Sequence, residues 1–600
     1  MEEKKILKRE EVPAEYTWNL GDIYSSASDW EKDAAKAEKL PAEIEKFKGH
    51  LGDGGETLLK WYQKMEEVSL LVEKLFGYAS LAADQDLGNN ENQARKGRMT
   101  GLYVKIQSAA AFEDAEIMEI PEEKLEGFYR EQKGLELYRH AIDLIRRRKA
   151  HTLSAAEEQL LAATQEMAEG PENIGSIFRN ADLKFPSVTD QNGQTHELTQ
   201  GTYGMMMESD DRVLRKNAFE IFYATWKAHE ALSATILDAH TKQQSFYARA
   251  RKYGSNLEAA LDATQVPVSV YHNLIDTVHQ HMNSMYRYMN LRKKMMGVDE
   301  LHMYDLSNFI VQDADEKITF EQAKEAVFKA IKPLGEEYTE VVRQAYENRW
   351  LDVYENEGKR SGAYSSGGAR PHPYILLNHK DNLNSQFTLI HETGHTMHSY
   401  LSMKNQPVIY SDYVIFVAEV ASTCNEVLMM KQLLLETKDK KKRAYLLNYF
   451  MDQFRTTLYR QTMFAEFELK INELVEGGET LTADRMNEMY YDLNRLYYGD
   501  EMVVDEQIAG EWARIPHFFY NYYVYQYATG FSAAIALATR ILKEGEPAVR
   551  DYLKFLSSGS STDPISLLKI AGVDMSSPAP INDALDQFDG LITEMEELFY

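Results

Sequence analysis

The chain has 600 residues and a formal net charge of −28, because 94 acidic residues outnumber 66 Lys and Arg. Such an acidic chain is a poor match for nucleic acid or for anionic membranes, and it weakly favours cationic ligands. Hydrophobic residues make up 44% and charged residues 27%, which indicates a globular protein. A chain of this length can bury a large core, in two or more units.

The cysteine content and the first residues indicate where such a protein works. Cys424 is the single cysteine, which excludes an intrachain disulfide framework and favours a reducing cytoplasm. The N-terminal residues contain no apolar run, so we expect no signal peptide. No stretch has the apolar length that a membrane span needs. We expect a cytoplasmic protein, and no feature of the sequence indicates an oligomeric state.

The first third of the chain is predicted to be helical. Only 15 Pro and 33 Gly occur, and alternating apolar runs are few, so the whole chain is expected to be mostly helical. A helical pattern runs from about 29 to 169. Asn192-Gly193 lies between two short strand-like runs and predicts a hairpin. Near this hairpin we place the boundary between an N-terminal helical domain, 1–200, and a catalytic domain, 201–600.

Helices, a loop and a strand are predicted to follow. Long helices are expected at about 205–250 and 270–296, the second ending at a glycine. Thr319-x-x-Gln322 is a capping box and predicts a helix start. A glycine-rich segment, 361–370, then precedes a short strand at 374–378. Two interpretations of the strand stay open: an exposed edge that pairs with an extended peptide, or a buried strand under an ordinary surface loop.

The motif His391-Glu392-x-x-His395 follows that strand, in a segment predicted to begin a helix near 381–384. On a helix, His391 and His395 share one face and can both bind one Zn²⁺. Glu392 would then act as the general base that takes a proton from an activated water. The other His-Glu pairs lack a second histidine three residues later: His196-Glu197 and His229-Glu230.

A catalytic zinc needs a third protein ligand and one open position. His398 is on the same helical face but about 10.5 Å from His391 along the axis, so we expect it near the metal or the substrate, or buried in a structural role. Glu419 is the better ligand, because a second helix can return it and because a carboxylate in an apolar run is costly to bury unpaired. Glu426 either holds a ligand imidazole or lies in solvent.

These two segments carry a resemblance to a known family. The motif H-E-T-G-H-x-x-H at His391, followed by A-E-V-A-S-T-x-N-E ending at Glu426, resembles the M3 family of zinc metallopeptidases and its oligoendopeptidase F group. The runs 15–24, 512–530 and 552–575 are also similar to that group, so the resemblance covers most of the chain. It implies a mostly α-helical, two-domain, neurolysin-like zincin that encloses a deep substrate channel, with a small β element near the active site.

The resemblance also implies the site residues. One Zn²⁺ per chain would be bound by His391, His395 and Glu419, with Glu392 as the base. A peptidase further needs a donor where the oxyanion forms, and the aromatic run 517–531 would cover every face of a helix. The residues of this run that match the family's histidine and tyrosines are His517, Tyr522 and Tyr525. Tyr525 is the favoured oxyanion donor, and the choice between the tyrosines stays open.

The expected function is zinc-dependent endopeptidase cleavage of short oligopeptides, with neither nucleic acid nor membrane as a partner. No covalent intermediate is needed, and Cys424 is interpreted as a small buried residue. One alternative is a helical zinc exopeptidase of the carboxypeptidase or dipeptidase type. Another is a non-catalytic helical binding protein with a structural metal, although a structural zinc normally has four protein ligands and no adjacent glutamate.

Overall fold

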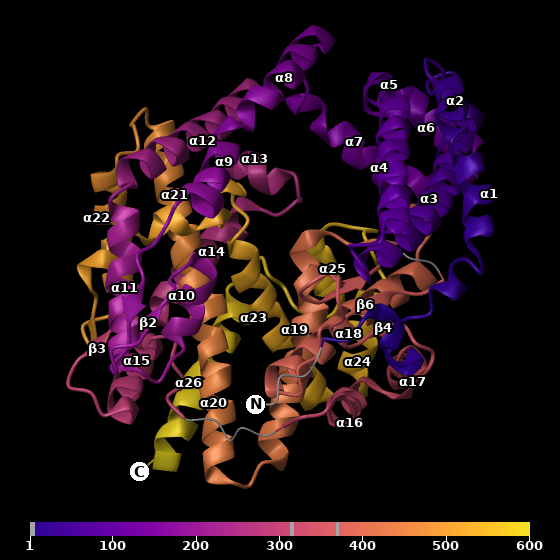
Figure 1. The fold of residues 1–600 in the computed structure, drawn as a ribbon. Helices are drawn as coiled ribbons and strands as arrows, with labels where there is room; N and C mark the ends of the chain where they lie inside the picture. Colours follow the sequence, from indigo (N-terminus) through magenta and orange to yellow (C-terminus); the bar gives the residue numbers. More distant parts are fainter. Residues whose placement is uncertain (1–5, 312–316, 368–370, 600) are drawn as a thin grey trace. The chain divides into compact units, whose positions relative to one another are not determined.

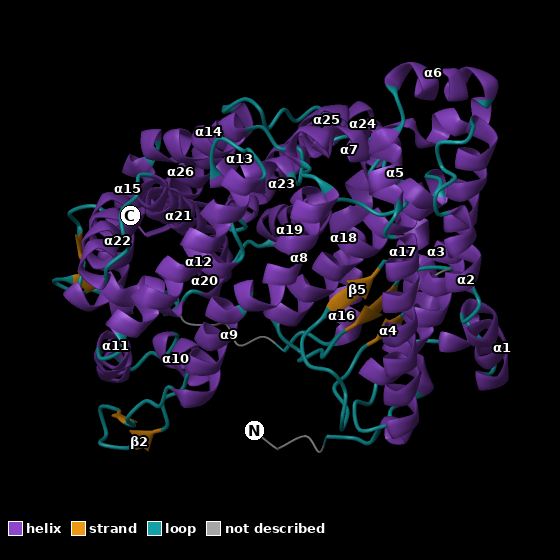
Figure 2. Ribbon diagram, turned by 90° about the horizontal axis from the view of Figure 1, so that it is seen from above, coloured by secondary structure: helices purple, strands orange, loops and turns teal. Residues whose placement is uncertain are grey.

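The computed structural model describes residues 6–311, 317–367 and 371–599. Helices dominate it (Figure 1), and the strands, orange in Figure 2, are two or three residues long. This confirms the mostly helical fold expected from the sequence. Within the described residues, no helix combines the length and the apolar character that crossing a bilayer requires.

The chain forms two compact units, each built from three separate stretches. The first unit comprises Met1–Ala150, Glu316–Gln432 and Leu537–Gly572, and the second comprises His151–Asp315, Leu433–Ala536 and Val573–Tyr600. These units are defined by packing, and each is described by itself below. The sequence-based domains 1–200 and 201–600 stay a prediction.

The first unit combines an N-terminal group of helices with a small sheet. Its elements are α1 (Ala27–Ala37), α2 (Leu40–Ile44), α3 (Gly55–Asp84), α4 (Asn90–Ala110), α5 (Glu113–Glu119), α6 (Glu122–Glu131), α7 (Arg139–Arg147), α16 (Phe320–Ile331), α17 (Glu336–Glu347), β4 (Leu351–Asp352), β5 (Tyr364–Ser366), β6 (Tyr374–Leu376), α18 (Leu383–Asn405), most of α19 (Ile415–Glu436), the end of α23 (Tyr525–Glu544), α24 (Glu546–Leu556) and α25 (Pro564–Ile570). Trp30 and Trp61 are fully buried in one apolar core that also includes Tyr374 and Leu376 of β6. The predicted strand is therefore part of the core that the N-terminal helices build.

The sheet of this unit has the order β4-β6-β5. β6 pairs parallel to β4 and antiparallel to β5, and all three of its residues are buried. The buried-strand interpretation of 374–378 is thus confirmed, and the exposed-edge interpretation of that strand is wrong. The two edge strands are β4 and β5, and β5 arises from the glycine-rich segment where no strand was expected. Residues 368–370 of that segment lie outside the described residues.

The second unit is a helical assembly with two pairs of short strands. Its elements are α8 (Ala155–Ala168), α9 (Gly170–Ile177), β1 (Val188–Thr189), β2 (Thr195–His196), α10 (Gln200–Met207), α11 (Arg212–Lys227), α12 (Glu230–Ala250), α13 (Asn256–Asp262), α14 (Val268–Gln280), α15 (Met282–Met296), β3 (Leu301–His302), α20 (Lys440–Gln453), α21 (Arg460–Glu476), α22 (Ala483–Tyr498), β7 (Met502–Val503), the start of α23 and α26 (Ala579–Phe599). β1 and β2 form the predicted hairpin, with Gly193 at φ +80° in its turn.

Sequence signals for the ends of helices were confirmed in both units. Thr319 and Gln322 form the predicted capping box at the start of α16. Gly297 ends α15 in the left-handed conformation, which a residue without a Cβ adopts without strain. The long helical runs are interrupted by caps that the apolar pattern did not reveal. Asp211, for example, accepts two backbone N–H bonds and begins α11.

Candidate metal centre

α18 carries the predicted metal motif. Asn382 caps it by accepting the backbone N–H of Ser385, and the helix then continues to Asn405. It packs against α16, α17, α24 and β5 of the same unit. The helix is buried on several sides, so the orientation of its motif residues is fixed by packing rather than by the motif alone.

Gly394 allows a second segment to approach α18 closely. A Cβ at this position would lie 2.5 Å from Cα of Ser422 and 2.8 Å from the carbonyl oxygen of Ala421. Such distances are not compatible with a side chain, so only glycine allows the backbone of α19 to come so near. This approach brings Glu419, one turn before Ser422, to the two motif histidines.

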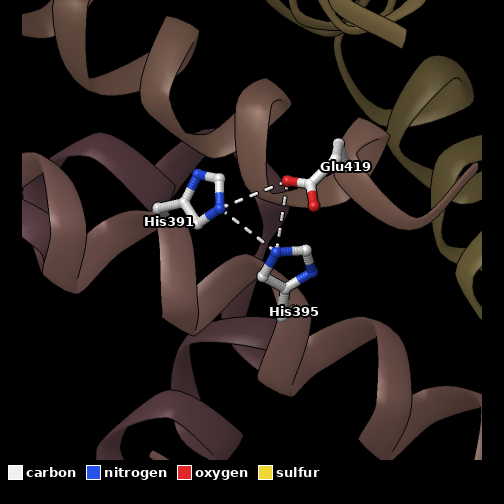
Figure 3. Close-up of side chains that lie close together, drawn as sticks. All are labelled: His391, His395 and Glu419. Atoms are coloured by element: carbon white, nitrogen blue, oxygen red, sulfur yellow. Dashed lines mark hydrogen bonds and ion pairs between the residues drawn. The ribbon is translucent and has the colours of Figure 1, made fainter. Parts of the chain in front are cut away.

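The three predicted ligands meet at one point (Figure 3). Nε2 of His391 lies 3.1 Å from Nε2 of His395. Oε2 of Glu419 lies 3.3 Å from the first nitrogen and 3.4 Å from the second. The three side chains converge from two helices, with their ligand atoms facing one another.

This triangle fits a tetrahedral metal ion. Two ligands that each lie about 2.0–2.1 Å from a zinc ion, at a tetrahedral angle, are separated by about 3.3 Å. The three observed separations, 3.1, 3.3 and 3.4 Å, are close to this value. Three ligands leave the fourth tetrahedral position for water or substrate, as catalytic zinc sites require.

Glu426 fixes the orientation of His391. Its Oε1 lies 2.5 Å from Nδ1 of His391, so the imidazole donates Nδ1–H to the carboxylate and presents Nε2 to the ligand triangle. Although burial lowers the pKa of His391, hydrogen bonds to Glu419 and Glu426 raise it to about 10. The sequence left two roles open for Glu426, and the structure shows the contact with a ligand imidazole, that of His391.

Glu419 reaches the site for a different reason than the sequence suggested. Its side chain is 46% exposed, so the carboxylate is only partly buried, and the cost of burying it is smaller than the sequence suggested, although the residue that this argument selected is in the triangle. Burial raises the pKa of Glu419, but hydrogen bonds with His391 and His395 outweigh this effect and hold the pKa well below its usual range. The carboxylate is therefore ionised and able to bind a cation.

Glu392 is buried beside the triangle. Its residue is 6% exposed, and its Oε2 has no hydrogen-bond partner among the described residues. The backbone N–H of Ser365, in β5, hydrogen-bonds the carboxylate, and burial is the main reason that the pKa of Glu392 is raised. The contact with Ser365 was not foreseeable, because it needs the strand that the sequence did not reveal.

His398 is buried, in agreement with the structural role left open for it. It is 1% exposed and stacks on Tyr413, with ring centroids 3.7 Å apart. The hydroxyl of Tyr413 in turn lies 3.0 Å from Oγ of Ser399. His398 is not a member of the ligand triangle, as the helix rise predicted.

Cys424 is also buried, as expected. It is a free thiol with no exposed surface. Burial raises its pKa to about 12, so the thiol is neutral near pH 7 and unsuited to act as a nucleophile.

The remaining predicted site residues belong to the second unit. The aromatic run does not form one helix: a turn at Pro516–Phe519 and an irregular segment precede α23, which begins at Tyr525. Tyr522 and Tyr525 are 3% and 1% exposed. His517 is half-buried, with Nε2 3.4 Å from the hydroxyl of Tyr527. This pairing joins His517 to a tyrosine that the sequence did not single out, and the roles of His517, Tyr522 and Tyr525 stay predictions.

Comparisons with known proteins identify the class to which this fold and site belong. The family model of Peptidase family M3 matches residues 205–587, and that of Oligopeptidase F matches residues 116–185. Oligopeptidase PepF of Bacillus subtilis is 47% identical over 600 residues, which are 100% of this chain and 90% of that protein.

Solved structures agree with these matches. Oligoendopeptidase-F from Enterococcus faecium superposes with a TM-score of 0.73 at 36% identity, over 95% of this chain and 99% of that chain. A structure from Chlamydophila abortus that was assigned as a peptidase has a TM-score of 0.93 at 32% identity, over 99% of this chain and 100% of that chain.

The helical fold with its His-His-Glu triangle is that of a metallopeptidase. The chain belongs to peptidase family M3, in the oligoendopeptidase F group, and is a metalloendopeptidase that hydrolyses oligopeptides. This decides against the non-catalytic binding protein and the exopeptidase that the sequence had left open.

Proposed function

We propose that the metal is zinc, one ion per chain, held by His391, His395 and Glu419. The observation that carries this proposal is the ligand triangle, whose edges of 3.1, 3.3 and 3.4 Å match tetrahedral zinc. The donor set of two imidazoles and one carboxylate is also one that catalytic zinc uses. Zinc in this position would supply a Lewis acid that polarises the scissile carbonyl and acidifies water.

Glu392 is proposed as the general base. It takes a proton from the attacking water and then gives that proton to the amine that leaves. Its position supports this role, because Ser365 hydrogen-bonds the carboxylate while Oε2 has no partner among the described residues. The carboxylate is therefore held in place and still has an oxygen able to accept a proton.

The peptide is proposed to lie along β5. This strand is one of the two edges of the three-stranded sheet and also the element that holds Glu392. An extended peptide that paired with β5 would be aligned by backbone hydrogen bonds, without regard to most of its side chains. Such pairing would explain how one site accepts many short peptides.

The oxyanion is proposed to be stabilised by donors from the aromatic run: His517 with Tyr522 or Tyr525. This proposal rests on the resemblance of the aromatic run to that of the M3 family, and on the need for a donor where negative charge develops. The contact between His517 and Tyr527 adds Tyr527 to the candidates. A deep substrate channel and a cytoplasmic location are proposed on the same resemblance, the second supported also by the single, free cysteine. The domain division at 200 is proposed from the hairpin signal in the sequence.

The test uses a quenched fluorescent peptide of about ten residues, with the purified zinc-loaded chain. Chelation should abolish cleavage, and added zinc should restore it. Glu392→Gln should lower kcat by about 10²–10⁴-fold with zinc content unchanged, since a general base contributes that much. Glu197→Gln is the matched control and should leave kcat unchanged. Glu197 also follows a histidine, His196, but that histidine is not part of the ligand triangle.

Two outcomes would contradict the proposal. Cleavage that persists after complete removal of zinc would exclude a metal-dependent reaction. Wild-type kcat in Glu392→Gln would exclude Glu392 as the base. Mass spectrometry of the products should find cleavage at internal bonds.

A further inference from the structure

Glu468 of α21 is a buried carboxylate in the second unit that the proposed mechanism does not use. Its residue is 2% exposed. One oxygen, Oε1, accepts the backbone N–H of Tyr522 at 2.6 Å, and Oε2 has no hydrogen-bond partner among the described residues. A buried carboxyl that makes one contact, to the backbone of the predicted oxyanion segment, requires an explanation.

That backbone is strained. Asn521 and Tyr522 have φ angles of +47° and +59°, and they are the only two consecutive non-glycine residues with positive φ in the described chain. Side chains with a Cβ adopt this left-handed conformation at a cost in free energy. Such strain persists only where the surrounding structure holds it, and it gathers at functional sites.

α21 supplies a row of three residues that hold this turn: Glu468, Asn472 and Glu476, spaced four apart on one helical face. Asn256, at the start of α13, connects the row to the turn. Its Nδ2 donates at 2.8 Å to Oδ1 of Asn472 and also to Oδ1 of Asn521. Its backbone N–H donates to Oε1 of Glu476 at 2.6 Å. The two left-handed residues are thus each bound by a polar contact, which is buried for Tyr522 and partly buried for Asn521.

The turn sets where the tyrosines of this segment point. Tyr522 is its second residue, and α23 begins three residues later with Tyr525. Both rings pack on Tyr271 of α14, with centroid distances of 5.4 Å for Tyr522 and 5.1 Å for Tyr525. A change at the turn would therefore move both phenols, and displacements of about 1 Å are enough to impair catalysis strongly.

We propose that Glu468 is a positioning residue for the peptidase reaction: through the Tyr522 amide it holds the left-handed turn from which the oxyanion tyrosines project. This inference rests on the proposed function of the 517–525 segment. Glu468 itself touches neither the metal ligands nor, in this proposal, the substrate. Its contribution is to keep the segment in one conformation.

Because the carboxyl group of Glu468 is buried, its positioning role should depend on pH. Burial raises the pKa of Glu468 to about 8, against the opposing effect of the Tyr522 N–H. The titratable groups that face it are Tyr271 from α14 and Tyr522, and the pKa values of both phenols lie well above their usual range, so both stay neutral. Glu476 of the same helix is bound to Asn256. Below about pH 8 the carboxyl is neutral, and above it a charge without a counter-ion develops in the core. The desolvation cost of that charge outweighs its hydrogen bond to the Tyr522 N–H and favours opening of the turn.

The experiment compares Glu468→Ala and Glu468→Gln in the zinc-loaded full chain, with Glu473→Ala, exposed on the same helix, as the control. Glu468→Ala should lower kcat by about tenfold or more with a smaller change in KM. Glu468→Gln keeps a carbonyl oxygen for the Tyr522 N–H and should retain kcat at pH 7. We expect kcat of the wild type to fall above about pH 8, and Glu468→Gln should lack this fall.

A second readout does not depend on peptidase activity. Tyr520 is 48% exposed beside the turn, so chymotrypsin should cleave at 520–523 faster in Glu468→Ala than in Glu468→Gln or the wild type. Unchanged kcat and unchanged chymotrypsin cleavage in Glu468→Ala would overturn the proposal, as would an alkaline limb in Glu468→Gln identical to that of the wild type. If Glu468→Ala does not fold, the pH profile of the isosteric Glu468→Gln decides alone.

These outcomes are distinct from failure of the proposed function. If Glu392 is not the base, Glu392→Gln retains activity whatever the Glu468 variants do. If the turn is unimportant, cleavage stays zinc-dependent and dependent on Glu392 while the Glu468 variants behave as the wild type.

Discussion

The orientation of one imidazole illustrates how single residues set up the metal centre. His391 has two ring nitrogens, and only the one facing the triangle can bind a metal. The carboxylate of Glu426 binds Nδ1 at 2.5 Å, so Nε2 is the nitrogen that faces the triangle. A hydrogen bond of this kind also raises the basicity of the ligand. Glu426 should therefore contribute to zinc affinity without contacting the ion.

We predict that Glu426→Ala weakens zinc binding by about 10–100-fold, the usual effect of removing such a partner. The affinity is measured by competition with a chromophoric chelator at fixed pH. Glu436→Ala is the control, because Glu436 is an exposed carboxylate near the end of the same helix. Equal affinities of the wild type and Glu426→Ala would show that His391 is oriented by the packing of α18 alone.

Among single residues, those that reach the site through helical spacing were predictable from the sequence. Those that reach it through a tertiary contact were not. His391, Glu392 and His395 follow from one motif, and helix rise excluded His398 from the ligands. By contrast, Ser365 reaches Glu392 from a distant strand. No spacing along the sequence encodes such a contact, because the partners are brought together by the packing of whole elements.

At the scale of elements, the metal centre depends on how closely α18 and α19 approach. The hydrogen atom of Gly394 faces the backbone at Ala421 and Ser422, and no larger group fits there. The motif residues lie one turn to either side of this point or closer. Separation of the two helices would move Glu419 away from both histidines. The glycine between the two motif histidines is therefore a requirement of the ligand triangle.

We predict that Gly394→Ala destabilises the protein by about 1–3 kcal/mol, as overpacking of a core does, and also weakens zinc binding. Thermal unfolding with and without chelator, together with zinc titration, measures both effects. Gly101→Ala in α4 is the matched control, since a Cβ there meets nothing within 4 Å. It should stabilise its helix by about 1 kcal/mol, the propensity difference between the two residues.

Gly394→Ala with wild-type zinc affinity would mean that α19 can shift without moving Glu419. A destabilisation equal in the presence and absence of chelator would point to the same conclusion.

Elements with strong local signals were predicted well, and those that depend on partners were not. Asn192-Gly193 predicted its hairpin and Thr319 its capping box, because turn and cap chemistry is local. β5 was missed, since three residues in a glycine-rich segment become a strand only by pairing with β6. The aromatic run was expected to be helical throughout, and the left-handed turn at Asn521 and Tyr522 interrupts it.

At the scale of the whole molecule, the two compact units could not be derived from a single boundary in the sequence. Each unit collects three stretches, and two of the boundaries fall inside α-helices, α19 and α23. Composition and periodicity change at linkers, whereas a boundary inside a continuous helix leaves no such change in the sequence. Helix content was therefore predictable, and the grouping of helices was not.

Net charge is the whole-molecule property with the clearest consequence for substrates. The formal charge of −28 creates a field that attracts cationic peptides and repels anionic ones before any specific contact forms. Two quenched peptides with the same cleavage site, flanked by lysines in one and glutamates in the other, isolate this effect. At about 20 mM salt, we predict that kcat/KM for the cationic peptide is about tenfold higher or more, since steering of this kind changes encounter rates by 10–10³-fold.

The salt dependence separates this field from a specific acidic subsite. Interactions beyond about 10 Å are screened at 0.1 M ionic strength, whereas contacts within a bound complex are screened much less. The preference should therefore shrink toward parity at about 0.5 M salt, chiefly through the KM of the cationic peptide, while a neutral peptide with the same cleavage site stays constant. A preference that survives high salt would instead locate the discrimination at particular carboxylates in the peptide-binding site, and the net charge would then affect solubility rather than substrate choice.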